Sequence, residues 1–123
     1  MNTEKPKVLL VDDEPRILLS HSLLLHTAGI ETVTLKDSRA VMSLLQKENI
    51  AVAIIDLSMP HLSGTELLSK IRYDFPHISV IIMTATNEIE KAVECIRLGA
   101  IDYLVKPVEK SRLFSSINKA IEL

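Results

Sequence analysis

The chain has 123 residues, enough for one domain of ordinary size with a single apolar core. Hydrophobic residues make up 47% of the chain and charged residues 24%, both near the average for soluble globular proteins. The formal net charge is -2, so the sequence lacks the basic footprint of a nucleic-acid-binding protein, and we expect no direct contact of this segment with DNA or RNA.

The first predicted elements are a strand and a helix. Residues 7–11 form a short, continuous apolar run, which favours a strand covered on both faces. Residues 14–28 are leucine-rich on more than one side. We expect them to form a helix, because Pro15 suits a first helical turn and Gly29 suits a C-terminal cap.

The next four elements continue this alternation. A weaker strand is predicted at residues 31–35, and an apolar stripe with helical spacing follows within residues 40–45. A second continuous apolar run, at residues 52–55, predicts another buried strand, and residues 67–71 carry the apolar side chains of the next helix.

The last four elements repeat the pattern twice. Residues 79–83 form a third continuous apolar run, and residues 89–96 carry a helical stripe that Gly99 is expected to stop. A weaker strand is predicted at residues 101–105, and a final amphipathic helix at residues 113–121.

Strands and helices thus alternate about five times along the chain. This order is typical of an α/β fold with a doubly wound parallel sheet, in which right-handed crossovers place helices on both faces. The sequence contains no linker and no short internal repeat, so we expect residues 1–123 to form a single domain.

Polar side chains follow the predicted strands at the points where these strands end. Asp12 and Asp13 follow the first strand, Asp56 the third, Thr84 the fourth and Lys106 the fifth. In doubly wound folds, ligands bind beyond the carboxyl ends of the strands. We therefore expect these five side chains to converge at one edge of the sheet.

The acidic members of this group point to a cation site. Two carboxylates about 4 Å apart repel each other by roughly 4 kcal/mol at an effective dielectric constant of ~20. A protein can protonate one of them or bind a cation, and an all-oxygen set made by Asp12, Asp13 and Asp56 suits a hard cation such as Mg²⁺. For the Asp12–Asp13 pair alone, a solvated acidic loop at the start of a helix is the commoner explanation.

Lys106 and Thr84 favour a site for phosphoryl transfer. A lysine beside an acidic site can neutralise a carboxylate or hold a phosphoryl oxygen, and Thr84 offers a hydroxyl donor. Each residue alone is ordinary, but their arrival from different strands is hard to obtain by accident. We therefore predict that Asp56 is a nucleophile that becomes an aspartyl phosphate, in a reaction that depends on positioning and charge stabilisation.

Four stretches also resemble the receiver domain of bacterial two-component response regulators, and the resemblance covers essentially the whole chain. They are VLLVDDE at residues 8–14, DLSMP at 56–60, MTA at 83–85 and GAIDYLVKP at 99–107. Residues 83–109 look most like the receivers of sigma-54-dependent activators and hybrid kinases.

The resemblance implies a flavodoxin-like (βα)5 fold with strand order 2-1-3-4-5. In this family a glycine opens the third helix, and Gly64 occupies that position. The resemblance also implies a cis peptide bond between Lys106 and Pro107.

For the site, the resemblance implies that a sensor histidine kinase donates the phosphoryl group to Asp56. The carboxylates of Asp13 and Asp56 and the backbone carbonyl of Ser58 would bind Mg²⁺, with Mn²⁺ as the alternative ion. Asp12 would act mainly through a coordinated water.

The resemblance further implies a switch that a partner detects. On phosphorylation, Thr84 would move toward the phosphoryl group and Tyr103 would swing inward behind it. The surface of the fourth helix, fifth strand and fifth helix would change, and an output domain, a downstream protein or a second copy of the chain would bind there. Such a domain is not an enzyme, beyond assisting its own phosphorylation and dephosphorylation.

The lifetime of the phosphorylated state is predicted to exceed that of the chemotaxis regulator. That regulator has an amide at the Ser58 position and an acid at the Thr86 position, on the path of the hydrolytic water. Here neither residue is a strong base or an amide.

Other polar residues are predicted to be structural. His21 is expected to be a satisfied or partly exposed histidine, and Cys95 a partly buried small residue. The fourth helix is expected to present a charged, solvated face, formed by Glu88, Glu90, Lys91, Glu94 and Arg97.

Two other functions compete with the phosphoacceptor. A phosphatase of the haloacid dehalogenase type needs a second acid two residues after the nucleophile, where this sequence has Ser58. A pseudo-receiver, which binds partners without phosphorylation, stays open as the alternative, although the presence of Asp56 and Lys106 argues against it. A nucleotide-binding enzyme is excluded more firmly, because no GxxxxGK[ST] segment is present.

We expect a cytoplasmic location without membrane contact. No apolar run approaches the roughly 20 residues that cross a bilayer. Residues 1–7 have no apolar signal core, and a single cysteine, which cannot form an internal disulfide, fits a reducing compartment.

Overall fold

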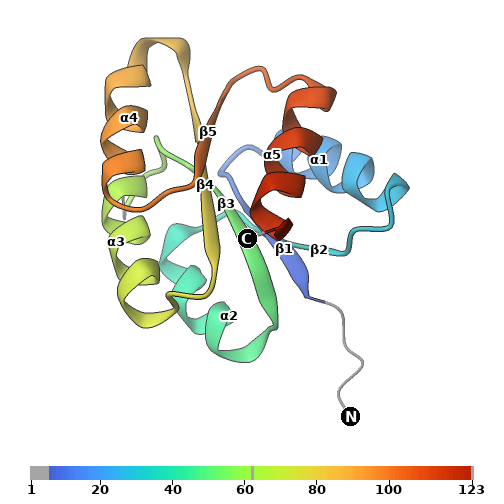
Figure 1. The fold of residues 1–123 in the computed structure, drawn as a ribbon, viewed down its shortest axis with the longest axis horizontal. Helices are drawn as coiled ribbons and strands as arrows, with labels where there is room; N and C mark the ends of the chain where they lie inside the picture. Colours follow the sequence, from blue (N-terminus) through green and yellow to red (C-terminus); the bar gives the residue numbers. More distant parts are fainter. Residues whose placement is uncertain (1–5, 62, 123) are drawn as a thin grey trace.

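A five-stranded parallel sheet forms the centre of the computed structural model, which describes residues 6–61 and 63–122 (Figure 1). The strand order is β2-β1-β3-β4-β5, so the predicted order is confirmed. In chain order the elements are β1 (Lys7–Val11), α1 (Pro15–Thr27), β2 (Thr32–Leu35), η1 (Ser38–Ala40), α2 (Val41–Lys47), β3 (Ile50–Asp56), α3 (Gly64–Asp74), β4 (Ser79–Thr84), η2 (Thr86–Glu88), α4 (Ile89–Arg97), β5 (Asp102–Val105) and α5 (Lys110–Glu122).

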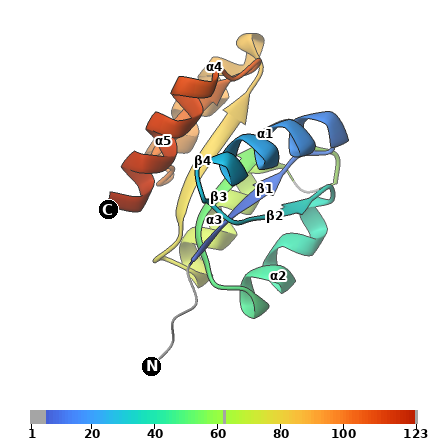
Figure 2. The ribbon, with the colours of Figure 1, turned by 90° about the vertical axis from the view of Figure 1, so that its right-hand side faces the viewer.

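The helices cover both faces of the sheet. Helices α1 and α5 lie on one face, and α2, α3 and α4 lie on the other (Figures 1 and 2). Alternate residues of each central strand enter the two apolar layers, as Leu9 and Val8 do on β1. Both layers need apolar side chains, which explains why these strands are continuous apolar runs in the sequence.

The predicted helix boundaries agree with the structure where Pro or Gly marks them. Helix α1 begins at Pro15, and Gly29 follows its end with φ +77°, the left-handed conformation that glycine adopts without steric cost. Gly64 opens α3 as expected. The peptide bond between Lys106 and Pro107 is cis, which confirms that prediction.

Gly64 is required because α3 begins against the end of β3. A Cβ atom at this position would lie 2.8 Å from the Cα of Leu57. The Ser63 side chain caps the helix by accepting a hydrogen bond from the Glu66 N–H at 3.3 Å. At its other end, the connection is fixed by the Leu57 N–H, which donates to the Met83 carbonyl at 2.8 Å. The β3–α3 connection is therefore held at both ends.

None of the helices in the described part of the chain combines the length and apolar character that crossing a bilayer requires.

Candidate functional site

The carboxyl edge of the sheet brings the predicted polar residues together. Asp56 is the last residue of β3 and Thr84 the last of β4, while Asp12 and Lys106 directly follow β1 and β5. The Lys106 N–H donates to the Thr84 carbonyl at 2.8 Å, which continues the pairing of β4 with β5. The predicted convergence of strand ends is thus present in the fold.

Three carboxylates form one cluster at this edge. Each of Asp12, Asp13 and Asp56 offers an oxygen within 4.8 Å of the others. Asp12 and Asp56 are buried, with 0% and 5% of their surface exposed, whereas Asp13 faces solvent. Backbone N–H groups orient the buried pair: that of Glu14 donates to Asp12 Oδ1 at 2.9 Å, and that of Ser58 donates to Asp56 Oδ1 at 3.2 Å.

Lys106 bridges the two buried acids. Its Nζ lies 2.9 Å from Asp12 Oδ2 and 3.1 Å from Asp56 Oδ2. Burial by itself would lower the pKa of the lysine, but the contacts with Asp12 and Asp56 outweigh burial and raise that pKa. Lys106 is therefore a permanent cation at neutral pH, placed where a second anion could replace a carboxylate.

The state of Asp12 fits a cation site. Burial raises the pKa of this carboxyl, although Lys106 and the Glu14 N–H act in the opposite direction. Its buried Oδ2 accepts no hydrogen bond of good geometry from the described residues and has only the ion pair with Lys106. An incompletely compensated acid in an all-oxygen cluster suits a hard divalent cation such as Mg²⁺.

The Thr84 hydroxyl is turned toward backbone carbonyls. Its Oγ1 lies 3.2 Å from the Ala85 carbonyl oxygen and 3.3 Å from that of Glu88, and the residue is fully buried. A hydroxyl has one proton, so these two acceptors share it. Tyr103, the other expected switch residue, lies half-buried on β5.

Glu88 belongs to the site, and the sequence analysis missed it. The prediction placed this residue on a solvated face of the fourth helix, but the helix begins one residue later and Glu88 ends the η2 turn. Its side chain is only 24% exposed, and its Oε2 accepts a hydrogen bond from Ser58 Oγ. The only clue in the sequence is an acid that precedes the helical stripe.

Comparison with known proteins identifies the family. Residues 8–118 match the response regulator receiver domain. The chain belongs to this family. The receiver domain is a signalling domain of two-component response regulators and not a catalytic enzyme.

The chain is also similar to individual regulators. It is 42% identical over 113 residues to the response regulator protein FleR of Pseudomonas aeruginosa, a match that covers 90% of this chain and 24% of FleR. It is 34% identical to the transcriptional regulatory protein GlrR of Escherichia coli, in a match that covers 99% of this chain and 28% of GlrR. This receiver domain therefore spans about a quarter of the length of these relatives.

Solved structures agree on the fold. A receiver domain protein from Clostridium thermocellum superposes with a TM-score of 0.90 at 36% identity, covering 96% of this chain and 95% of that one. Full-length FixJ from B. japonicum gives a TM-score of 0.90 at 32% identity and covers 98% of this chain and 59% of FixJ.

Two buried residues of the receiver domain differ from expectation. His21 is only 7% exposed, and its Nδ1 has no hydrogen-bond partner in the described residues, so the prediction of a satisfied or partly exposed histidine is wrong. Burial, with a smaller contribution from Lys106, lowers its pKa, which keeps the imidazole neutral. Cys95 is fully buried rather than partly buried, and burial raises the pKa of its thiol.

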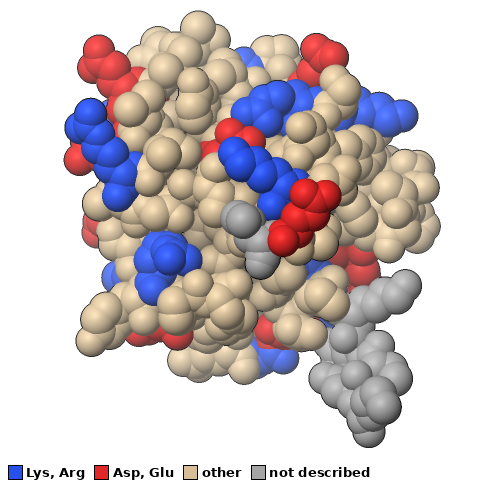
Figure 3. Space-filling view, viewed as in Figure 1, with Lys and Arg blue, Asp and Glu red and all other residues tan. Residues whose placement is uncertain are grey.

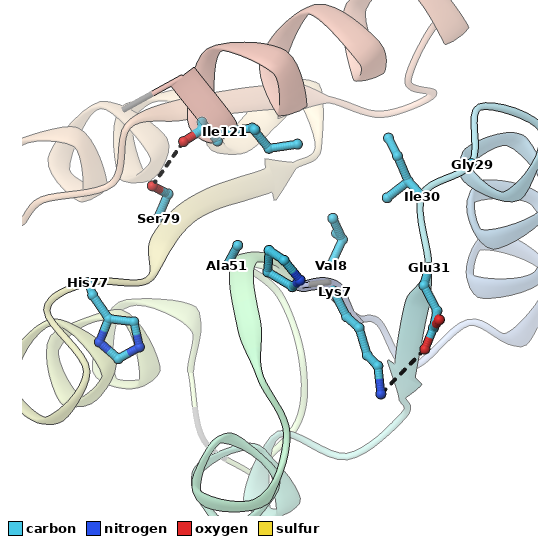
Figure 4. A pocket seen from close by; sticks show the side chains of 11 residues that line it. Lys7, Val8, Gly29, Ile30, Glu31, Ala51, His77, Ser79 and Ile121 are labelled. Carbon is cyan, nitrogen blue, oxygen red and sulfur yellow. Dashed lines mark hydrogen bonds and ion pairs between the residues drawn. The ribbon is translucent and has the colours of Figure 1, made fainter. Parts of the chain in front are cut away.

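A cavity of about 530 Å³ lies at the opposite, amino edge of the sheet (Figure 4). Ile30 and Ile121 stand on its two sides, and Ala51 and Val8 lie between them. None of the clustered acids lines this cavity. The acidic cluster and this cavity therefore lie at opposite edges of the sheet.

Proposed function

We propose that Asp56 accepts a phosphoryl group from a sensor histidine kinase. The observation that carries this proposal is the Lys106 ammonium group 3.1 Å from the Asp56 carboxylate, at the edge where the other clustered acids lie. A carboxylate is an established covalent nucleophile for phosphoryl groups. An adjacent ammonium group can stabilise the charge that its phosphorylation brings.

A divalent cation would be held beside Asp56 by residues that follow β1 and by residues at the end of β3. The carboxylates of Asp13 and Asp56 and the backbone carbonyl of Ser58 would be ligands, with Asp12 acting through a bound water. Mg²⁺ is the expected ion and Mn²⁺ the alternative. When bound, the ion offsets the charge that would repel a phosphodonor. The exposure of Asp13 leaves the cluster open to solvent.

Lys106 and Thr84 would bind the remaining phosphoryl oxygens. Lys106 lies between Asp12 and Asp56, so it has only to exchange a carboxylate oxygen for a phosphoryl oxygen. Thr84 would turn its hydroxyl from the backbone carbonyls to the phosphoryl group, and Tyr103 on the neighbouring strand would move inward with it. The domain would thereby assist its own phosphorylation and its own dephosphorylation.

The output surface would be α4, β5 and α5. Helix α4 exposes apolar side chains, with Ile89 36%, Val93 42% and Ile96 40% exposed. Charged side chains of both signs lie among uncharged ones on this side of the molecule (Figure 3). This mixture suits contact with a protein, either an output domain, a downstream protein or a second copy of the chain, better than contact with nucleic acid.

The longer relatives support a role in transcription. GlrR and FixJ are named transcriptional regulatory proteins, and the chain matches 28% of the first and 58% of the second. We propose that residues 1–123 are one receiver domain that works in the cytoplasm with an output domain of this kind. A sigma-54-dependent activator or a hybrid kinase stays the predicted context.

The test uses beryllofluoride, which mimics an aspartyl phosphate, in the presence of Mg²⁺. Amide NMR spectra of the wild type should shift around Asp56, Thr84 and Tyr103, and those of Asp56→Asn should not. Asp74→Asn is the matched control, because Asp74 is an exposed acid at the end of α3. It should respond as the wild type does.

A wild type that binds neither Mg²⁺ nor beryllofluoride would contradict the proposal that Asp56 is a phosphoacceptor. The chain would then be a pseudo-receiver, an interaction module that works without phosphorylation. A mimic that binds equally well to Asp56→Asn would instead show that another residue is the acceptor.

A further inference from the structure

Glu88 connects the two loops that flank the site. Its Oε2 accepts a hydrogen bond from Ser58 Oγ, while the Ser58 N–H donates to Asp56 Oδ1 at 3.2 Å. Its Oε1 lies 3.8 Å from Lys91 Nζ, one helical turn away. A carboxylate from the β4–α4 connection is thus tied, through one serine, to the proposed phosphoacceptor.

The backbone of the same residue holds the Thr84 hydroxyl. The Glu88 carbonyl oxygen lies 3.3 Å from Thr84 Oγ1, and the Glu88 N–H donates to the Ala85 carbonyl at 3.0 Å. No hydrogen bond joins Thr84 to Asp56 among the described residues. Before this hydroxyl can donate to a phosphoryl group on Asp56, it must leave the carbonyl of Glu88.

We propose that Glu88 is a positioning residue that opposes phosphorylation of the domain. The hydrogen bond from Ser58 to its side chain holds the η2 turn where the Glu88 carbonyl retains Thr84. This inference rests on the proposed function of Asp56 and adds a residue that restrains it.

Phosphorylation would break this restraint by like-charge repulsion. Phosphorylation replaces the single negative charge of the Asp56 carboxylate with a phosphoryl charge of about −1.5 to −2 at neutral pH, so the site gains roughly half to one negative charge. Part of it is offset by Lys106, and the rest acts on the Glu88 carboxylate, which is tied to the same serine that contacts Asp56. Release of the side chain frees the turn, and with it the Thr84 hydroxyl.

Removing only the negative charge of Glu88 predicts whether the domain binds beryllofluoride more or less tightly. Glu88→Gln keeps an acceptor oxygen for Ser58 but removes the negative charge, and hydrogen bonds to charged groups are roughly twice as strong as neutral ones. The restraint should weaken, so beryllofluoride with Mg²⁺ should bind about three- to tenfold more tightly. Ser58→Ala removes the donor and should act in the same direction.

The experiment is a beryllofluoride titration at saturating Mg²⁺, followed by amide NMR. Glu90→Gln is the matched control, because it removes the same charge from an exposed residue two positions away and should leave the affinity unchanged. The double variant of Ser58→Ala and Glu88→Gln should gain no more than the Ser58→Ala variant, since both changes act on the same hydrogen bond.

A second readout separates positioning from general loosening. With Mg²⁺ alone, the Thr84 amide of Glu88→Gln should shift part of the way toward its beryllofluoride-bound position, whereas that of Glu90→Gln should not. Equal affinities for Glu88→Gln and wild type, or weaker binding by the variant, would overturn the proposal while leaving the phosphoacceptor role of Asp56 intact. A wild type that does not bind beryllofluoride would contradict both this proposal and the phosphoacceptor role of Asp56. If Glu88→Gln does not fold, Ser58→Ala decides by the same criteria.

Discussion

Each edge of the sheet carries a lysine between two acids, and the two arrangements differ in burial. At the amino edge, Lys7 Nζ lies 2.8 Å from Glu48 Oε1 and 3.3 Å from Glu31 Oε2. The side chains of Glu48 and Glu31 are 34% and 69% exposed, so water solvates each charge whether or not the lysine is present. Pairs of this kind contribute little to stability.

At the carboxyl edge, distances of similar length join a lysine of similar exposure to two acids that water barely reaches. Lys106 Nζ lies 2.9 Å from Asp12 and 3.1 Å from Asp56, whose side chains are 0% and 7% exposed. Here the two carboxylates depend on the lysine, because the desolvation of an unpaired ion in a protein interior costs on the order of several kcal/mol.

The comparison teaches that the spacing of charges does not by itself make a site. The amino edge could lose a charge without consequence for its neighbours. The carboxyl edge cannot, so its charges respond together when a phosphoryl group or a cation arrives. This coupling allows a covalent change at Asp56 to reach Thr84 and the surface beyond it.

The largest expected difference comes from removing each lysine in turn. Lys106→Met leaves Asp12 and Asp56 buried without a cation and should lower the free energy of unfolding by about 3 kcal/mol at neutral pH. Lys7→Met, the matched change at the amino edge, should produce no resolvable loss. Urea unfolding without Mg²⁺ measures both, and equal losses would contradict the comparison.

The stability that Lys106→Met loses should be partly restored by Mg²⁺ and by acid. Added Mg²⁺ should restore part of its stability, because the cation would replace the missing positive charge between the acids. Acid should restore part of it as well, since protonated carboxyls need no partner. A loss that neither Mg²⁺ nor acid reduces would indicate a packing defect instead.

Asp102 shows whether the burial of a carboxylate alone, or its lack of hydrogen-bond donors, determines how that carboxylate affects stability. It opens β5, is 14% exposed, and accepts hydrogen bonds from Arg112 at 2.9 Å and from Ser116 at 2.9 Å. Burial would raise its pKa, but the bonds from Arg112, Ser116 and the Tyr103 N–H overcome that effect and lower it. This acid is therefore half-buried and fully satisfied, unlike Asp12, which is fully buried.

Asp102→Asn should cost about 2 kcal/mol at pH 7, because hydrogen bonds to a charged group are lost. A folded-state pKa below the unfolded value of about 3.9 gives stability that is present above this pH and lost as the pH falls through the folded-state pKa. The difference between variant and wild type should thus shrink below pH 4. Urea unfolding at pH 7 and below pH 4 measures the difference in free energy of unfolding between variant and wild type. Asp74→Asn, which changes an exposed acid, is the control. A difference that does not depend on pH would contradict this account.

A smaller effect of opposite sign is expected at Asp12. Its folded-state pKa is raised by burial, so its ionised form costs stability at neutral pH, and this cost disappears below the unfolded pKa. Asp12→Asn should therefore raise the free energy of unfolding by about 1 kcal/mol at pH 7 without Mg²⁺.

The same variant should bind Mg²⁺ less tightly than the wild type, so that saturating Mg²⁺ removes its advantage. Unfolding curves at pH 7 with and without Mg²⁺ provide the measurement. If Asp12→Asn destabilised the Mg²⁺-free protein, the carboxylate would be fully compensated by Lys106, and the case for a cation beside it would weaken.

The sequence was sufficient for the sheet and for the position of its edge. Strands β1, β3 and β4 are continuous apolar runs because helices cover both faces, and each run stops at a polar residue. Since parallel strands end on the same side, Asp56, Thr84 and Lys106 had to meet there. The continuous apolar runs and the polar residues that end them contain this information. The order of the strands and the cis bond before Pro107 came from the family resemblance.

Glu88 and His21 could not be predicted in this way. Glu88 reaches Ser58 because the η2 turn separates it from α4, and a turn of three residues leaves no periodic pattern. The sequence therefore grouped it with charges that do face solvent. His21 lies on the buried side of α1, but whether its Nδ1 finds a donor or acceptor depends on side chains from other elements. Contacts between distant segments decide both cases.

The smallest expected effect tests whether the amino edge is independent of the site. Ala51 lies on β3 and lines the cavity of about 530 Å³ at that edge. Ala51→Val adds apolar surface in this space and suits a strand, so it should stabilise the protein by about 0.5 kcal/mol. Ala51→Ser, of similar size but polar, should not.

Beryllofluoride affinity should be unchanged in both variants, because Ala51 and Asp56 lie at opposite ends of the same strand. A change in affinity with Ala51→Val would mean that packing at the amino edge is transmitted along β3, and the two edges would then have to be treated as one coupled unit.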